Sequence, residues 1–151
     1  MKNLIIGILM LVAATQASAS FIPQGQALRA LPVQADGRVK PFDSFAREML
    51  ELIYGKQKYE ARDAYEIILT WMLAPATWQS KELFEVRNME VLKRLGLDTD
   101  KRYYKGEELF SNSKFSDLRS ELAQKRETKE KLTPYFQALQ RLENQFFVFS
   151  E

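Results

Sequence analysis

The 151-residue chain contains no cysteine and no histidine. Without cysteine it can form no disulfide, and it has no thiol nucleophile or thiolate metal ligand. Without histidine it lacks the usual general base near neutral pH, the commonest zinc ligand and the usual haem ligand. Ser-His-Asp and Cys-His triads are therefore excluded, and any catalysis would have to use carboxylates, lysine or tyrosine.

An excess of charge of one sign is also missing. The 22 lysines and arginines nearly balance the 20 aspartates and glutamates, which leaves a formal net charge of +2. These charges are mixed along the chain rather than gathered in blocks, a pattern typical of solvated helix faces. A near-neutral chain gives no argument for nucleic acid, so we expect no nucleic-acid partner.

Long hydrophobic runs are absent except at the N-terminus. Lys2 precedes the apolar run Leu4–Ala14, and Ala17-Ser18-Ala19 then fits the small-residue cleavage pattern of signal peptides. The sequence therefore predicts a signal peptide over residues 1–19, cleaved after Ala19. It also predicts an exported, periplasmic domain over residues 20–151.

A membrane anchor is the alternative interpretation of the same run. A spanning helix needs about 20 apolar residues, whereas Thr15, Gln16 and Ser18 interrupt the run here. The flanking residues therefore favour the signal peptide. No cysteine is present to carry a lipid anchor.

Hydrophobic spacing predicts a mainly α-helical fold, a single small domain of five or six helices with a short extended segment near the N-terminus. The number depends on whether one turn at 107–110 counts as a helix. Helices are expected over residues 43–54, 62–74, 89–95, 107–110, 113 or 116 to about 132, and 134–149. Extended segments are expected over residues 28–34 and 82–87.

Several residues indicate where the helices begin and end. Asp43 or Ser44 is predicted to cap the first helix, which Gly55 ends. Asn88 and the pair Thr133-Pro134 are typical N-terminal signals for two later helices. The helix over 62–74 is apolar nearly all round, which predicts a position at the centre of the domain.

The most informative stretch is LPVQADGRVKPFDSFAREML, residues 31–50. Ala35-Asp36-Gly37 predicts a turn, because glycine accepts a positive φ. Arg38, Lys40, Pro41 and Asp43 follow closely. In a structural interpretation the two cations pair with Asp36, Asp43 or Glu48. In a functional one they form a polar docking face for an extended partner segment or an anionic group. The residues leave both open.

This stretch resembles a segment of the system II (Ccs-type) cytochrome c biogenesis proteins, particularly fused forms of the cytochrome c synthase. The resemblance extends more weakly over about residues 28–150. In those proteins a polytopic membrane protein carries haem on histidines and presents it to the CxxCH motif of an apocytochrome. No haem ligand can be transferred to a chain without histidine. The matching residues are Pro32, Val33, Gln34, Gly37, Arg38, Lys40, Pro41, Asp43, Ser44, Ala46, Arg47 and Glu48.

The resemblance implies a non-enzymatic periplasmic accessory domain of a haem-attachment complex. Its partner would be a membrane-embedded cytochrome c synthase-like protein or apocytochrome c, docked through the turn from Gly37 to Asp43. We expect no catalytic residue, no metal and no cofactor on this chain, with haem on a partner. Membrane association would come through that partner. The expected partner-binding residues are Gly37, Arg38, Lys40, Pro41, Asp43, Arg47 and Trp78.

Aromatic residues offer two further candidate surfaces. Trp78 would mark a partner surface if it were exposed next to Phe84. Phe146, Phe147 and Phe149 crowd the last helix, and one helix face cannot bury all three. Two are expected in the core, and the third is a candidate contact with a membrane partner or with a second copy of the chain.

Two alternative functions remain at this point. A carboxylate-based cell-wall glycan hydrolase would need a buried acid and a second carboxylate about 5–9 Å away. The helical carboxylates Glu48, Glu51, Asp63 and Glu66 supply candidates, but nothing in the sequence singles out a pair. A general periplasmic peptide-binding module would instead need an exposed groove beside the segment 37–41.

Overall fold

The computed structural model describes residues 25–35, 37–129 and 131–150. The predicted signal peptide, and the start of the predicted periplasmic domain, lie outside these residues. The described chain forms eight helices and three two-stranded antiparallel sheets. The prediction of a mainly α-helical protein with an extended segment near the start is therefore confirmed. The helix number is higher than predicted.

The helices alternate with three pairs of short strands. The helices are α2 (Gln26–Arg29), α3 (Phe42–Tyr54), α4 (Ala64–Leu73), α5 (Ala76–Gln79), α6 (Met89–Leu95), α7 (Gly106–Phe110), α8 (Ser113–Glu127) and α9 (Pro134–Ser150). The strands are β1 (Pro32–Ala35), β2 (Arg38–Pro41), β3 (Lys58–Tyr59), β4 (Arg62–Asp63), β5 (Phe84–Glu85) and β6 (Tyr103–Tyr104). Strands pair β1 with β2, β3 with β4, and β5 with β6.

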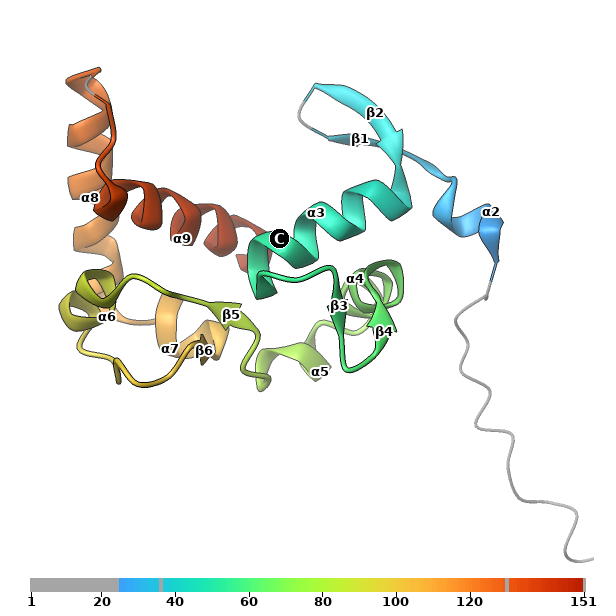
Figure 1. The fold of residues 1–151 in the computed structure, drawn as a ribbon, viewed down its shortest axis with the longest axis horizontal. Coiled ribbons are helices and arrows are strands. Elements are labelled where there is room, and N and C mark those ends of the chain that lie inside the picture. The colour runs from blue at the N-terminus through green and yellow to red at the C-terminus, as the bar shows by residue number, and fades with distance from the viewer. Residues whose placement is uncertain (1–24, 36, 130, 151) are drawn as a thin grey trace, which may run out of the picture.

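Helices α3 and α9 run across the middle of the molecule, and the shorter elements from β5 to α7 lie beneath them (Figure 1). Helix α3 packs against both α4 and α9. The β1–β2 hairpin stands above the N-terminal part of α3 and projects from the rest of the fold (Figure 1).

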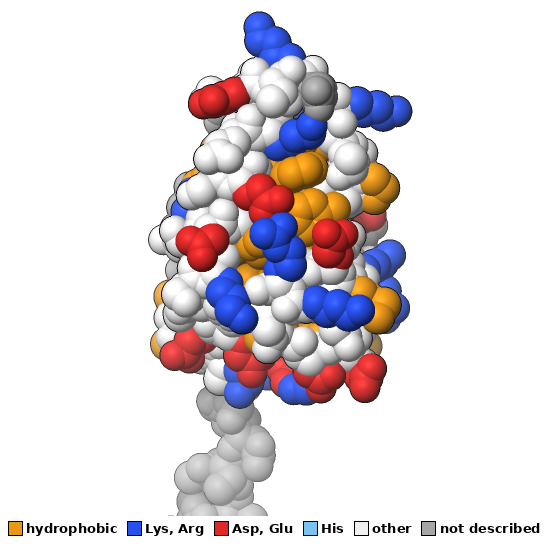
Figure 2. Space-filling model, turned by 90° about the vertical axis from the view of Figure 1, so that its left-hand side faces the viewer, with side chains coloured by type: hydrophobic (Ala, Val, Ile, Leu, Met, Phe, Trp, Pro, Cys, Tyr) orange, Lys and Arg blue, Asp and Glu red, His pale blue; other side chains and the backbone are white. Residues whose placement is uncertain are grey.

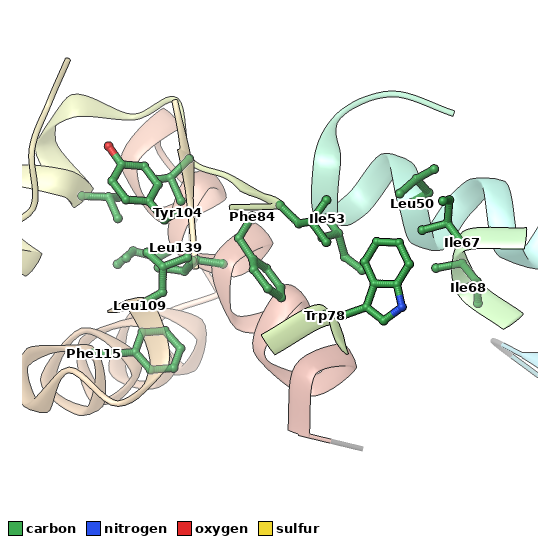
Figure 3. Close-up of a cluster of buried hydrophobic side chains, with 14 of the residues drawn as sticks. Leu50, Ile53, Ile67, Ile68, Trp78, Phe84, Tyr104, Leu109, Phe115 and Leu139 are labelled. Carbon is green, nitrogen blue, oxygen red and sulfur yellow. The ribbon is translucent and has the colours of Figure 1, made fainter. Parts of the chain in front are cut away.

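Apolar side chains from almost every element form one buried cluster (Figure 3). Phe84 lies between two groups of this cluster, one on the side of α3 and α4 and the other around α7 and α8 (Figure 3). The centroid of its ring lies 5.1 Å from that of Phe110, 5.7 Å from that of Phe149 and 6.0 Å from that of Trp71. Edge-to-face contacts at such distances add to the stabilisation from burial alone.

The predicted helix termini are mostly confirmed. Gly55 ends α3 with a φ of 74°, in the left-handed region that glycine enters without strain. The Asn88 side chain accepts hydrogen bonds from the backbone N–H groups of Glu90 and Val91 and so caps α6. Helix α9 begins at Pro134 as predicted.

Two predictions about where helices begin are wrong. The N-cap of helix α3 is Pro41, two or three residues before the predicted Asp43 or Ser44. Asp43 lies in the first turn, where a negatively charged carboxylate interacts favourably with the helix dipole. Residues 62–63 form strand β4 rather than the start of a helix, because they pair with β3. The extra helices are the four-residue α2 and α5.

The end of α3 is joined to α9 by side chains from far along the chain. Arg141 Nη2 donates to the backbone oxygens of Glu51 at 2.7 Å and Leu52 at 2.8 Å. Gln145 Nε2 donates to Leu52 O at 2.8 Å and to Glu85 O at 3.2 Å. The carbonyl of Leu52, in the last turn of α3, is of the kind that a helix C-terminus leaves without an intrahelical partner, and both side chains donate to it.

Helix α4 is central only along its first half. Its first residues, including Tyr65 and Ile67, are buried, but Met72 and Leu73 are about two-thirds exposed, at 66% and 67%. In α9, Phe147 is exposed while Phe146 and Phe149 pack against the core, as the crowding of this helix predicted. Among the described residues, no helix is both long enough and apolar enough to cross a bilayer.

Candidate functional site

Residues 31–50 fold into one unit, the β1–β2 hairpin followed by the first turns of α3. Two residues connect the strands, and Ala35 pairs with Arg38 beside the turn. Gly37 has a φ of 72°, the left-handed conformation that a tight hairpin turn requires. The predicted turn is therefore confirmed, whereas the return strand β2 was not predicted.

The two faces of the hairpin differ in chemistry. Side chains alternate between faces along a strand, and directly paired residues share a face. Val33 pairs with Lys40 and Ala35 with Arg38, so these four share one face. The opposite face, which we call the outer face, carries Pro32, Gln34, Val39 and Pro41. It contains no charged residue.

The predicted cations lie on the face with Val33 and Ala35. Lys40 is 7% exposed and its Nζ forms an ion pair with Glu48 of α3. The Arg38 guanidinium is exposed, and its Nη2 lies 4.0 Å from the other oxygen of Glu48. The structural interpretation therefore holds for Lys40, which joins the hairpin to α3. Arg38 stays at the rim, where an exposed pair of this length stabilises little.

The outer face is exposed to solvent. All four of its residues are exposed, and Val39 is 69% exposed, the highest value among the large hydrophobic residues in the described chain. In a hairpin with a two-residue turn, the pairs 34–39 and 32–41 direct their backbone groups outward. Pro32 and Pro41 have no N–H to offer there. The strand edges therefore supply few donors for an added strand, and the outer face is the more prominent surface.

Asp43 and Arg47 belong to a different cluster. Arg47 Nη2 lies 2.6 Å from Asp43 Oδ2, and Arg29 Nη1 lies 3.9 Å from Asp43 Oδ1. Arg29 Nη2 in turn lies 2.5 Å from Asp63 Oδ2, and Lys58 Nζ lies 3.1 Å from Asp63 Oδ1. These five residues alternate in sign around a cavity of about 290 Å³.

The charge network fixes the state of one carboxylate. Hydrogen bonds from Lys58 and then Arg29 hold the pKa of Asp63 below its usual range, against the opposing effect of desolvation. The pKa of Arg29 is raised, mainly by its hydrogen bond to Asp63. Both groups are thus held in their charged forms, which suits a structural link between α2, α3 and β4.

Trp78 does not belong to a surface. It is 3% exposed, and its ring stacks on Trp71 with centroids 5.9 Å apart and an interplanar angle of 2°. The prediction that it contacts a partner required exposure and is therefore corrected, because α5 turns this ring into the core. Among the described residues, its indole N–H has no hydrogen-bond partner in the protein.

The seven predicted partner-binding residues thus lie in three places. Gly37, Arg38, Lys40 and Pro41 are in the hairpin, Asp43 and Arg47 are in the charge network, and Trp78 is in the core. Sequence reasoning missed Val39 as an exposed site residue. An available signal was the two-residue Asp-Gly turn, since it fixes the register and hence the faces of both strands.

The face at the α6 and α8 end of the molecule shows hydrophobic side chains along its middle, surrounded by cations and carboxylates (Figure 2). The charges there are of both signs, so this face carries no continuous basic stripe of the kind that binds nucleic acid. In the described part of the chain, no group of three or more histidine, cysteine, aspartate or glutamate residues is placed to hold a metal ion.

No protein-family model matches the chain, and no curated protein matches it.

Proposed function

We propose that this chain is a non-enzymatic periplasmic accessory domain of a cytochrome c biogenesis complex. It docks a membrane-embedded cytochrome c synthase-like protein, or apocytochrome c, through the β1–β2 hairpin. Haem remains on the partner. The proposal keeps the hairpin as the docking element and moves the central contacts from the cations to the uncharged outer face.

The observation that supports this proposal is the position of the resemblance. The residues that resemble the Ccs-type proteins lie in the projecting hairpin and in the first two turns of α3, the part of that helix above which the hairpin stands (Figure 1). This segment combines an ion pair between buried Lys40 and half-exposed Glu48 with an outer face that is exposed and uncharged. A pattern needed only for folding would explain the Lys40–Glu48 pair but not the matching residues Pro32, Gln34 and Pro41, which face solvent.

The chemistry of the outer face fits a protein partner. Burial of apolar surface contributes about 25 cal/mol per Å², so Val39 and the two prolines would favour association when covered. Gln34 can pair with a polar group within the interface. Exposed Arg38 lies at the rim, where a charge acts mainly on the association rate and on orientation.

A glycan hydrolase has less support. Its general acid needs a raised pKa, whereas the pKa of Asp63 is lowered. Glu48 is paired with Lys40, Glu66 lies 3.9 Å from Arg62, and Glu51 accepts a hydrogen bond from Gln57 at 3.0 Å. The four candidate carboxylates thus serve identifiable internal contacts.

Deletion of the encoding gene in its host tests the function. We expect loss of covalently bound haem from c-type cytochromes, measured by haem staining, while total haem is unchanged. Complementation with the wild-type chain should restore staining, and complementation with Val39→Asp should not. Normal c-type cytochrome levels in the deletion strain would contradict the proposal.

A further inference from the structure

A cavity of about 460 Å³ lies between the end of α3, the segment after β5, and α9. Its polar lining includes Glu51, Glu85, Arg87, Asn88, Arg141 and Gln145, and its apolar lining includes Val86, Ala138 and Leu142. This volume is within the range of about 300–1,000 Å³ that is typical of small-molecule sites. The hairpin contributes no residue to it.

Two arginines from different parts of the chain converge on one oxygen at this cavity. Arg87 Nε lies 3.0 Å from Glu85 Oε2, and Arg141 Nη2 lies 4.0 Å from the same atom. Arg102 Nη2 lies 2.6 Å from the other carboxylate oxygen, Glu85 Oε1. Three guanidinium groups thus surround the Glu85 carboxylate, although Arg102 lies outside the lining of this cavity. In the lining, Arg87 and Arg141 face Glu51 and Glu85, and Arg102 gives the cluster one net positive charge.

Arg87 and Arg141 each use only some of their guanidinium N–H groups in contacts with described residues. Arg141 uses Nη2 for the carbonyls of Glu51 and Leu52, and Arg87 meets Glu85 through Nε. Within residues 25–35, 37–129 and 131–150, their other guanidinium N–H groups have no partner. Arg87 and Arg141 are each more than 40% exposed in their side chains, so these donors are accessible to a ligand.

The carboxylate between them is held in place. The Glu85 side chain is 2% exposed, and a Cβ at Gly55 would lie only 2.1 Å from its Oε2. Burial opposes ionisation of Glu85, but hydrogen bonds from Arg87 and Arg102 outweigh it and keep the pKa below its usual range. Glu85 therefore acts as a fixed anionic anchor that aligns the arginines.

We propose that this cavity binds a small molecule that carries an oxyanion, a carboxylate or a phosphate, between the guanidinium groups of Arg87 and Arg141. Arginine forms charge-assisted, often bidentate hydrogen bonds with both groups. Val86, Ala138 and Leu142 supply an apolar wall for a short organic body beside the anionic group. The proposal is independent of docking by the hairpin.

Isothermal titration calorimetry at constant ionic strength tests the site with three probes: inorganic phosphate, acetate and succinate. We expect saturable one-site binding of at least one probe to the wild-type chain. Arg87→Ala should weaken it about tenfold or more, because a charge-assisted hydrogen bond is lost. Arg62→Ala, an arginine outside this lining, should leave it unchanged.

The pattern across probes identifies the source of the oxyanion. Binding of phosphate alone assigns the site to phosphate, and binding of acetate or succinate assigns it to carboxylates. A melting curve without ligand checks that Arg87→Ala is folded, and Arg87→Lys replaces it if it is not. Absence of saturable binding with all three probes would overturn the proposal. Equal weakening by Arg87→Ala and Arg62→Ala would overturn it as well.

Discussion

The β1–β2 hairpin and the β5–β6 pair are both two-stranded antiparallel sheets, yet their surroundings are opposite. Phe84 and Glu85 of β5 are both buried, the first in the aromatic core and the second among arginines. In the hairpin, Lys40 is buried but the outer face meets solvent. An isolated two-stranded sheet is only marginally stable. The core therefore stabilises β5–β6, whereas the hairpin is stabilised from one face and leaves the other available.

The largest effect is expected at Phe84. Phe84→Ala would remove a ring that is 1% exposed and contacts three other aromatic rings. We expect the free energy of unfolding to fall by about 3–5 kcal/mol, because buried Phe-to-Ala changes leave a cavity. Urea denaturation measures this. A loss below 1 kcal/mol would show that β5 is not part of the structural core.

A smaller effect is expected where α9 caps α3. Gln145→Ala removes the donors to Leu52 O and Glu85 O and leaves these carbonyls without this partner. We expect a loss of about 1–3 kcal/mol in the free energy of unfolding, as for other buried hydrogen-bonding groups. Gln137→Ala, on the same helix but exposed, is the control. Equal effects of the two variants would exclude a capping role for Gln145.

Acid should weaken the β5 region in a defined direction. The folded-state pKa of Glu85 is depressed by Arg87 and Arg102 in spite of burial, whereas an unfolded glutamate titrates near about 4.3. The stabilisation is therefore complete above the unfolded pKa and is lost as the pH falls through the folded pKa. Denaturation of wild type and Glu85→Gln between pH 7 and 2 should show their difference shrinking below about pH 4. A difference independent of pH would contradict this.

Sequence patterns predicted local features better than distant contacts. The turn at Gly37, the end of α3 at Gly55 and the cap at Asn88 each depend on neighbouring residues, and each was predictable. Strand β2 was missed because Arg38 and Lys40 make the segment polar, while burial of Lys40 depends on Glu48 of α3. Trp78 was assigned to a surface because the sequence does not show that the chain turns between Trp71 and Trp78 so that their rings stack.

The Glu85 cluster could not have been predicted from periodicity. Glu85, Arg102 and Arg141 are 17 to 56 positions apart, and they meet only because β5 pairs with β6 and α9 crosses the end of α3. The outer face of the hairpin could have been predicted from the sequence, because the Asp-Gly turn sets the register of the two strands. The alternation of exposed and buried residues then follows from strand geometry.

The smallest effect on stability is expected at the outer face of the hairpin. Val39→Asp changes an exposed side chain, so the free energy of unfolding should shift by no more than about 0.5 kcal/mol. The same change would place an unpaired charge at the centre of the proposed interface, which disfavours association strongly when desolvated. Met89→Asp, at another exposed apolar position, on α6, is the matched control.

Co-purification of the tagged chain with its haem-carrying membrane partner, from membranes of the host, measures the central claim most directly. We expect wild type and Met89→Asp to retain the partner in equal amounts and Val39→Asp to lose at least about nine-tenths of it, since a single unpaired charge in an interface weakens binding tenfold or more. Undiminished capture by a folded Val39→Asp variant would contradict docking through the outer face.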